Sequence, residues 1–196
     1  YGAFGIPTPI HALGRAIAGI SDIKVPDKPK PTFNVGVIHG GTSVHSIAAE
    51  ASLDVDMRSE DAKSVAAVDA AVQRVLRQAL AAENARWTGP RAAAAKLTMT
   101  IDTIGIRPTG AQSDEAPIVR TALAAAKALG ITSSTGASST DANLPISMGI
   151  PAIRIGGGGK GEGSHSLGEW YEDGPNGWVG PQWAALIVAA LAGVRP

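Results

Sequence analysis

Apolar side chains recur every three or four residues over two stretches of the first hundred positions, which predicts two amphipathic helices. The first helix is expected at about 8–20, after two prolines, and a proline-rich connector over 21–31 follows it. The second helix is expected at about 61–83, with Glu60 and Asp61 at its positively polarised end. Each helix is therefore expected to bury one apolar face.

Alternation of apolar and polar residues predicts strands at 33–39 and 46–58. In the first strand, alternation places Val37 and His39 on the same face as Phe33, whereas Ile38 is expected on the opposite face. The second strand alternates cleanly, as on an antiparallel sheet with one face in solvent. The residues between the two strands, 40–45, hold either a hairpin turn or a bulge.

A further strand is expected at 96–104, so the first part of the chain has the order helix, strand, strand, helix, strand. Adding one strand before residue 1 completes the order βαββαβ of a ferredoxin-like sandwich. The sequence therefore predicts an α+β protein in which residues 1–108 form a ferredoxin-like domain that lacks its first strand.

Residues 109–196 differ in pattern and are expected to be the end of a layered α/β domain. Four elements are expected there: a helix capped by Ser113 and ended by Gly130, a short helical piece after Asp141, a strand at 150–155, and a last helix opened by Pro181.

Composition narrows the classes of function. The 196 residues include 17 basic and 17 acidic side chains, so nothing indicates a nucleic-acid or anionic-membrane surface. The absence of cysteine excludes disulfides and thiolate sites, so any metal site would use histidine and carboxylates. The longest apolar run, 183–194, is shorter than the roughly 20 residues of a membrane span. No signal-peptide pattern is visible, so a cytoplasmic location is expected, and Tyr1 reads as the interior of a longer chain.

A glycine-rich loop over 156–163 follows the expected strand 150–155 and leads to His165 and Glu169. Glycine lets a backbone approach a ligand closely, and loops at strand ends carry much of the function of α/β proteins. An imidazole at this place binds a metal or transfers a proton, or else it is a solvated side chain on a surface loop. Spacing alone leaves both interpretations open.

Several stretches together resemble the co-catalytic zinc amidohydrolases and peptidases of the aminoacylase, carboxypeptidase G and peptidase T family. They are 1–11 (YGAFGIPTPIH), 36–47 (GVIHGGTSVHSI) and 53–58 (LDVDMR), which resemble the lid or dimerisation domain, and 138–143 (SSTDAN), 149–155 (GIPAIRI) and 163–165 (GSH) with Glu169, which resemble the end of the catalytic domain. The resemblance covers nearly the whole chain, and it implies that residues 109–196 are the C-terminal portion of a zinc-hydrolase domain.

The resemblance implies two zinc ions that are bridged by a carboxylate and a hydroxide, with a glutamate as general base. His165 matches the last metal ligand, and Glu169 would orient it through the other ring nitrogen, or else be a solvated acid. The family's remaining ligands and its general base precede the lid domain. Because a zinc ion needs about four ligands, the chain alone is expected to be inactive without an N-terminal fragment of the same protein.

The resemblance also implies substrate-binding residues, each with a structural alternative. Asp141 shapes the substrate pocket or caps the helical piece that follows it. Asn143 hydrogen-bonds substrate or closes a turn. Arg154 clamps a substrate carboxylate or, as the preferred interpretation, pairs with a nearby acid.

On the lid, many relatives carry asparagine where this chain has His45, so His45 is the candidate catalytic residue, a hydrogen-bond donor toward the substrate or oxyanion of the neighbouring subunit. His39 is expected to be structural, and His11 to be a surface or packing residue. Arg58 is expected to pair with Asp54 or Asp56.

The preferred function is zinc-dependent hydrolysis of a peptide or amide bond in a small substrate, within a homodimer formed through the lid domain. A short peptide is the favoured substrate and an N-acyl amino acid is the alternative. A second hypothesis is a non-catalytic dimerisation fragment that binds no metal. A third, a small-molecule module that uses the glycine loop as an anion nest, is weaker because the loop lacks P-loop spacing. Neither a nucleic acid nor a membrane is an expected partner.

Overall fold

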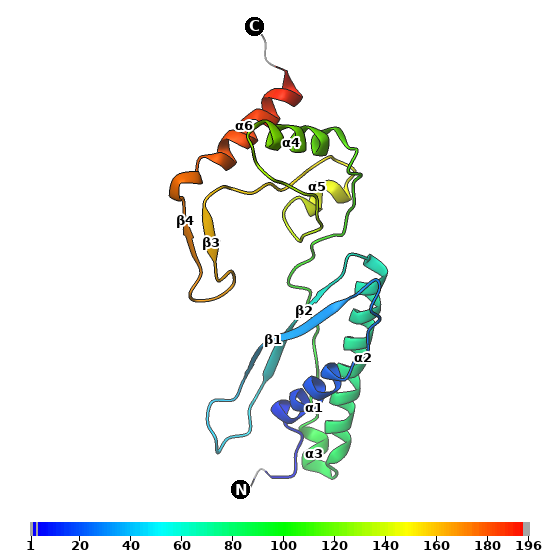
Figure 1. The fold of residues 1–196 in the computed structure, drawn as a ribbon. Coiled ribbons are helices and arrows are strands. Elements are labelled where there is room, and N and C mark those ends of the chain that lie inside the picture. Colours follow the sequence, from blue (N-terminus) through cyan, green and yellow to red (C-terminus); the bar gives the residue numbers. More distant parts are fainter. Residues whose placement is uncertain (1, 3, 194–196) are drawn as a thin grey trace. The chain divides into compact units, whose positions relative to one another are not determined.

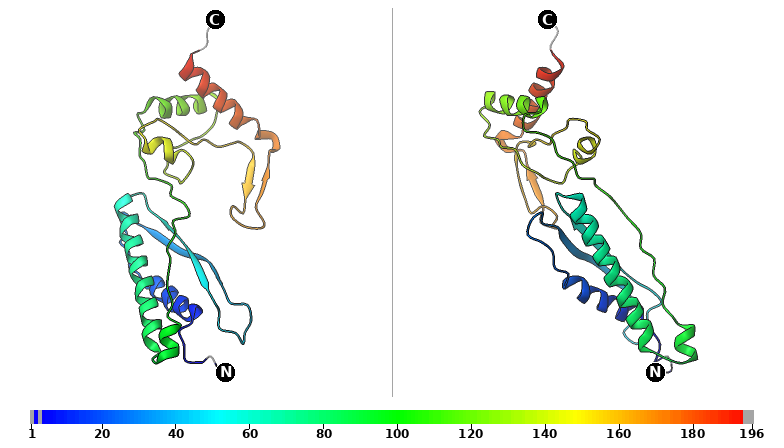
Figure 2. Two further views of the ribbon diagram at one scale, coloured as in Figure 1. Left: turned by 180° about the vertical axis from the view of Figure 1, so that it is seen from behind. Right: turned by 90° about the vertical axis from the view of Figure 1, so that its right-hand side faces the viewer.

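The computed structural model describes Gly2 and residues 4–193, and it divides into two compact units, Tyr1–Ile106 and Arg107–Pro196 (Figures 1 and 2). Both units combine helices with a small two-stranded antiparallel sheet, which confirms the α+β class. Tyr1 and Ala3, which belong to the first family-like stretch, lie outside the described residues.

The first unit is a hairpin of β1 (Thr32–Gly40) and β2 (Ala51–Arg58), with α1 (Pro9–Ser21) and α2 (Ala62–Arg86) packed on one face (Figure 1). The core consists of buried Ile20, Val68 and Val72 against the inward side chains of the hairpin. Helices α1 and α2 were predicted, and each is capped by a side chain. The Thr8 hydroxyl accepts from the backbone of His11, and Asp61 accepts from the backbone of Ser64.

A bulge in β1 changes which of its residues face the helices. Val35 lies opposite Val55, but the register shifts before Val37, so that Ile38 lies opposite Leu53. Ile38 is therefore on the helix-facing side, and Val37 and His39 are on the polar side. The predicted faces of these three residues are wrong because alternation along a strand cannot show an extra residue in the ladder.

Two predicted strand boundaries also change in the first unit. Strand β2 begins at Ala51 instead of residue 46, because residues 41–50 form the hairpin loop. The strand expected at 96–104 is not formed, and α3 (Pro90–Ala94) precedes that stretch. The ferredoxin-like arrangement therefore stays a prediction.

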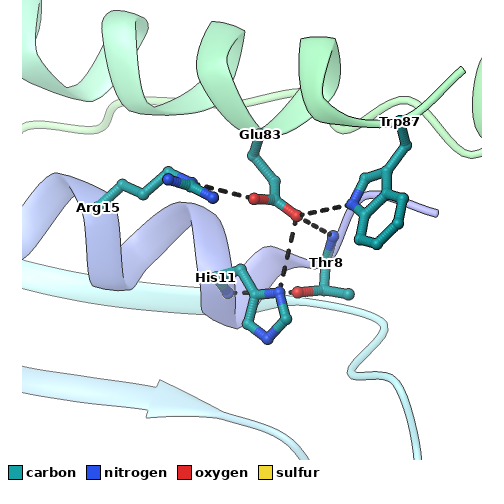
Figure 3. Close-up of polar contacts among 5 residues, drawn as sticks. All are labelled: Thr8, His11, Arg15, Glu83 and Trp87. Atoms are coloured by element: carbon teal, nitrogen blue, oxygen red, sulfur yellow. Dashed lines mark hydrogen bonds and ion pairs between the residues drawn. The ribbon is translucent and has the colours of Figure 1, made fainter. Parts of the chain in front are cut away.

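A buried carboxylate joins helices α1 and α2 of the first unit. Glu83, on α2, is fully buried and accepts hydrogen bonds from the Thr8 backbone N–H at 3.2 Å, Arg15 Nε at 3.1 Å and Trp87 Nε1 at 3.4 Å (Figure 3). His11 Nδ1 lies 3.8 Å from the same carboxylate. Burial alone would raise the pKa of Glu83, but these hydrogen bonds and the Arg15 charge outweigh burial and lower it.

In the second unit, α4 (Pro117–Ala128) packs against α6 (Val179–Ala192) over a core of Ala122, Ala125 and Ile187. Ile153 and Ile155 pack against this core from an extended segment. The strand predicted over 150–155 is wrong, because the structure assigns no strand there. The segment has the alternation of a strand but no neighbouring strand to pair with in the described part of the chain.

Helix boundaries and connections in the second unit differ in detail from the prediction. The Ser113 hydroxyl accepts from the Glu115 N–H in a turn, and α4 begins only at Pro117. Helix α6 begins at Val179, before Pro181. The short helix after Asp141 is confirmed as α5 (Asn143–Ser147). The hairpin of β3 (Lys160–Glu162) and β4 (Trp170–Glu172) and the 3₁₀ turn η1 (Gly174–Asn176) were not predicted.

Candidate functional site

His45 lies in the loop over 41–50 that joins β1 to β2. The start of this loop is held close to the unit, since an added Cβ at Gly40 would meet Ala51 Cβ at 2.7 Å and one at Gly41 would meet Ile10 Cδ1 at 3.2 Å. The rest of the loop is solvent-exposed, and the Ser43 hydroxyl lies 2.8 Å from His45 Nδ1. The structure thus presents the candidate catalytic imidazole on an exposed loop, and its partner Ser43 was not predicted from the sequence.

Asn143 closes a turn in the loop before α5. Its Oδ1 accepts from the Thr140 backbone N–H at 2.8 Å, and its Nδ2 donates to the Pro108 carbonyl at 3.1 Å. The amide thus fixes residues 140–143 and ties them to the segment that begins the second unit. This geometry supports the turn-closing interpretation, and direct substrate contact by Asn143 stays a prediction.

Asp141 is fully exposed on the same loop, and its partner is Arg107. Arg107 Nη2 lies 3.3 Å from Asp141 Oδ1, while Nη1 lies 3.4 Å from Ser139 Oγ. Asp141 does not cap α5, because the cap residue is Ala142 and the Thr140 hydroxyl accepts from its N–H. The carboxylate is therefore exposed to solvent and paired with a guanidinium, and a contact between Asp141 and substrate stays a prediction.

Arg107 was not among the site residues predicted from the sequence. The signal that points to it is its isolation, since it carries the single charge between Asp102 and Asp114. The surrounding segment packs closely on the loop and α5: an added Cβ at Gly110 would meet Ile146 Cγ2 at 2.7 Å. The Gln112 amide also bonds both backbone groups of Ala152. Residues 107–112 thus contact both the loop over 139–143 and Ala152.

The glycine loop packs against the start of α6. The Gly159 N–H donates to the Asn176 carbonyl at 3.3 Å, and an added Cβ at Gly158 would meet that carbonyl oxygen at 2.5 Å. Desolvation and the neighbouring Asp173 carboxylate raise the pKa of Tyr171, so its hydroxyl stays protonated and donates to Gly158 O. Close backbone contact therefore explains why these positions are glycine.

His165 follows this loop, in the turn between β3 and β4, and its side chain is exposed. Its φ of 67° lies in the left-handed region, which is uncommon for a residue other than glycine. Glu169 Oε2 lies 3.4 Å from the His165 backbone nitrogen, so the carboxylate contacts the backbone here. An orienting contact between Glu169 and the imidazole stays a prediction.

The ion pair predicted for Arg154 is not formed in the described part of the chain, whereas the pair predicted for Arg58 is formed. Arg154 is exposed on the extended segment 150–155, and the expected ion pair with an acid is not present in the described part of the chain. Its side chain is therefore accessible to a ligand.

Arg58 Nε lies 2.6 Å from Asp56 Oδ2, which confirms the predicted pair on the hairpin.

A zinc site requires several His, Asp or Glu side chains close together. Among Gly2 and residues 4–193, no group of three or more His, Asp or Glu side chains is placed to hold a metal. His165 would supply one ligand of about four, so the described residues do not form a zinc site by themselves. In the same residues, no helix is long and apolar enough to span a membrane.

Comparison with known proteins finds a match for one part of the chain. Residues 4–84 match the family model of the peptidase dimerisation domain, a region that comprises α1, β1, β2 and nearly all of α2. A search of curated proteins gives no match to the chain. The resemblance to a peptidase family is thus supported at a coarse level, through its dimerisation domain, and no particular member is singled out.

Proposed function

We propose that this chain is part of a zinc-dependent hydrolase that cleaves a peptide or amide bond in a small substrate. The observation that supports this proposal is the match of residues 4–84 to the peptidase dimerisation domain, which coincides with the helix-covered hairpin of the first unit. In this proposal the first unit forms a homodimer, and a short peptide is the substrate, with an N-acyl amino acid as the alternative.

In the proposed hydrolase, the first unit contributes His45 as a hydrogen-bond donor to the substrate of the neighbouring subunit. Its exposed position on the loop between β1 and β2 supports this role. A donor at this place would stabilise negative charge that develops on the scissile carbonyl oxygen.

The second unit would contribute His165 as one zinc ligand, with the remaining ligands supplied from outside the described residues. Asp141 and Arg154 would bind substrate, since both side chains are exposed. Asn143 would fix the loop that carries Asp141 through its hydrogen bond from the Thr140 N–H. Arg107 would orient the Asp141 carboxylate through its own hydrogen bond to Oδ1. No step of the reaction is assigned to a metal, because the described residues do not form its site.

A non-catalytic dimerisation module is the second candidate function. It is favoured by the fact that the described residues contain no group of three metal ligands. Both candidates predict a dimer, so oligomeric state does not separate them, whereas metal content does.

Elemental analysis of the purified protein, together with its intact mass, tests the proposal. About two zinc ions per copy of this chain, with the partner polypeptide or longer parent visible by mass, are expected for the hydrolase. His165→Ala should lower the zinc content toward one ion per copy of this chain and remove most of the hydrolysis of peptide or N-acyl substrates, whereas His39→Ala, on the polar face of β1, should change neither. A protein that stays zinc-free and hydrolyses neither substrate class even when its partner polypeptide or longer parent is present would favour the dimerisation module instead.

A further inference from the structure

The imidazole of His45 has a defined partner in a local turn. The Ser46 backbone N–H donates to the Ser43 carbonyl at 3.2 Å, which closes the turn. Within it, the Ser43 hydroxyl lies 2.8 Å from His45 Nδ1, a distance typical of a well-formed hydrogen bond. The contact therefore restricts both side-chain torsions of His45.

The turn also exposes its central residues. Val44, between Ser43 and His45, is fully exposed, and His45 is exposed as well. Neither side chain contributes to the core of the first unit, which is built from Ile20, Val68 and Val72. The ordered imidazole is thus not explained by packing of this unit, and it is available to another molecule.

We propose that Ser43 is a positioning residue for His45. In this proposal the hydroxyl donates to Nδ1, so the neutral ring carries its proton on Nε2 and presents that N–H as a donor. The inference rests on the proposed hydrolase function, in which His45 is a hydrogen-bond donor to the substrate. The opposite arrangement, with Nδ1–H donating to the hydroxyl, would leave Nε2 as an acceptor unable to serve an oxyanion.

Nitrogen-detected spectra of the histidine rings in the 196-residue chain near pH 8 test the geometry without any metal or activity. A protonated Nε2, an unprotonated Nδ1 and a nuclear Overhauser contact from the ring to Ser43 are expected for His45. Ser43→Ala should abolish the contact and allow the ring to populate several rotamers. An unprotonated Nε2, or ring signals that Ser43→Ala leaves unchanged, would overturn the proposal.

A double-mutant cycle in the active protein tests the function. Ser43→Ala should lower kcat/KM roughly fivefold, mainly through kcat, which corresponds to one neutral hydrogen bond. In the His45→Ala background the same change should have no effect, and Ser43→Thr, which keeps the hydroxyl, should retain activity. The matched control is Ser46→Ala, in the same turn. An equal loss from Ser43→Ala in both backgrounds would show that Ser43 does not act through His45.

The two proposals fail in distinguishable ways. If the protein hydrolyses neither substrate class, or if His45→Ala leaves hydrolysis unchanged, the catalytic assignment of His45 fails, and the ring spectra still decide whether Ser43 holds the imidazole. If His45→Ala reduces hydrolysis but Ser43→Ala does not, the hydrolase proposal stands and the positioning role of Ser43 is refuted.

Discussion

At the scale of single residues, Glu83 shows how a polar side chain can occupy a core position. It follows Val72 and Ala79 on the buried stripe of α2, and the stripe continues through it. A buried carboxylate is costly unless charged or polar donors surround it. Here donors from α1 and its cap meet it, so the acid specifies how the first turn of α1 docks on the end of α2.

Replacing this carboxylate should destabilise the first unit. We expect Glu83→Gln to lower the free energy of unfolding by about 2 kcal/mol at pH 7, because hydrogen bonds to a charged group are lost in a buried site. The pKa of Glu83 is lowered in the folded state, so its contribution is complete above the ordinary pKa of 4.5 and is lost as the pH falls through the folded-state pKa. Urea unfolding between pH 3 and 7 measures this.

The control for this prediction is Asp69→Asn, which replaces the other acid of α2. Asp69 is half-buried and accepts a hydrogen bond from the half-buried Gln73 one turn later. That substitution should cost less than about 0.5 kcal/mol. A Glu83→Gln protein as stable as wild type at pH 7, or a stability gap that widens on acidification, would contradict the role assigned to the buried carboxylate.

The candidate site residues were selected from the sequence, but their contacts were not. Asp141 and Asn143 were selected through the resemblance of residues 138–143 to a known family, and His165 because loops near strand ends commonly carry functional groups. Arg107 and Ser43 were not selected, since each has a partner that only the folded loop brings near. Sequence spacing gives no distance between residues 34 positions apart, as Arg107 and Asp141 are.

At the scale of elements, residues 95–100 have the alternating burial of a strand but pair with no neighbouring strand in the described part of the chain. Leu97 and Met99 are half-buried between exposed neighbours, as alternation predicts. Instead of a ladder, the Asn84 amide bonds both backbone groups of Leu97, donating to its carbonyl at 3.0 Å and accepting from its N–H at 2.9 Å. One side chain on α2 thus substitutes for a neighbouring strand.

This substitution of a side chain for a strand can be tested by hydrogen exchange. Asn84→Ala should speed exchange of the Leu97 amide about tenfold, because its acceptor is removed at a cost of about 1 kcal/mol or more. Asn84→Asp keeps an acceptor for that N–H and should preserve its protection, which makes it the matched control. Unchanged exchange in Asn84→Ala would mean that the stretch is held by strand pairing after all.

Element types were predictable where a periodicity has one physical cause. The helices over α1, α2 and α4 follow from their apolar stripes, and the two strands of the first hairpin follow from alternation. Pairing is different, because it depends on what lies alongside. The bulge before Val37 and the unpaired segment 150–155 are properties of the neighbours, and a single strand's sequence does not encode them.

At the scale of the whole molecule, the two units offer different surfaces for association. The peptidase dimerisation match, residues 4–84, lies wholly within the first unit. The second unit exposes apolar side chains on α6, among them Val188 and Leu191. An apolar helix with an uncovered side is a possible interface in its own right. Self-association of the chain therefore has two candidate origins.

If the matched domain drives association, a polypeptide of residues 1–106 should dimerise as the 196-residue chain does. Both should give twice the monomer mass by light scattering at the same molar concentration, with circular dichroism as the check on folding. Val188→Asp in the full chain should leave the dimer intact, because it alters only the exposed side of α6. A monomeric 1–106, together with loss of the dimer on Val188→Asp, would instead assign self-association to the second unit and leave the hairpin and its helices without a dimerising role.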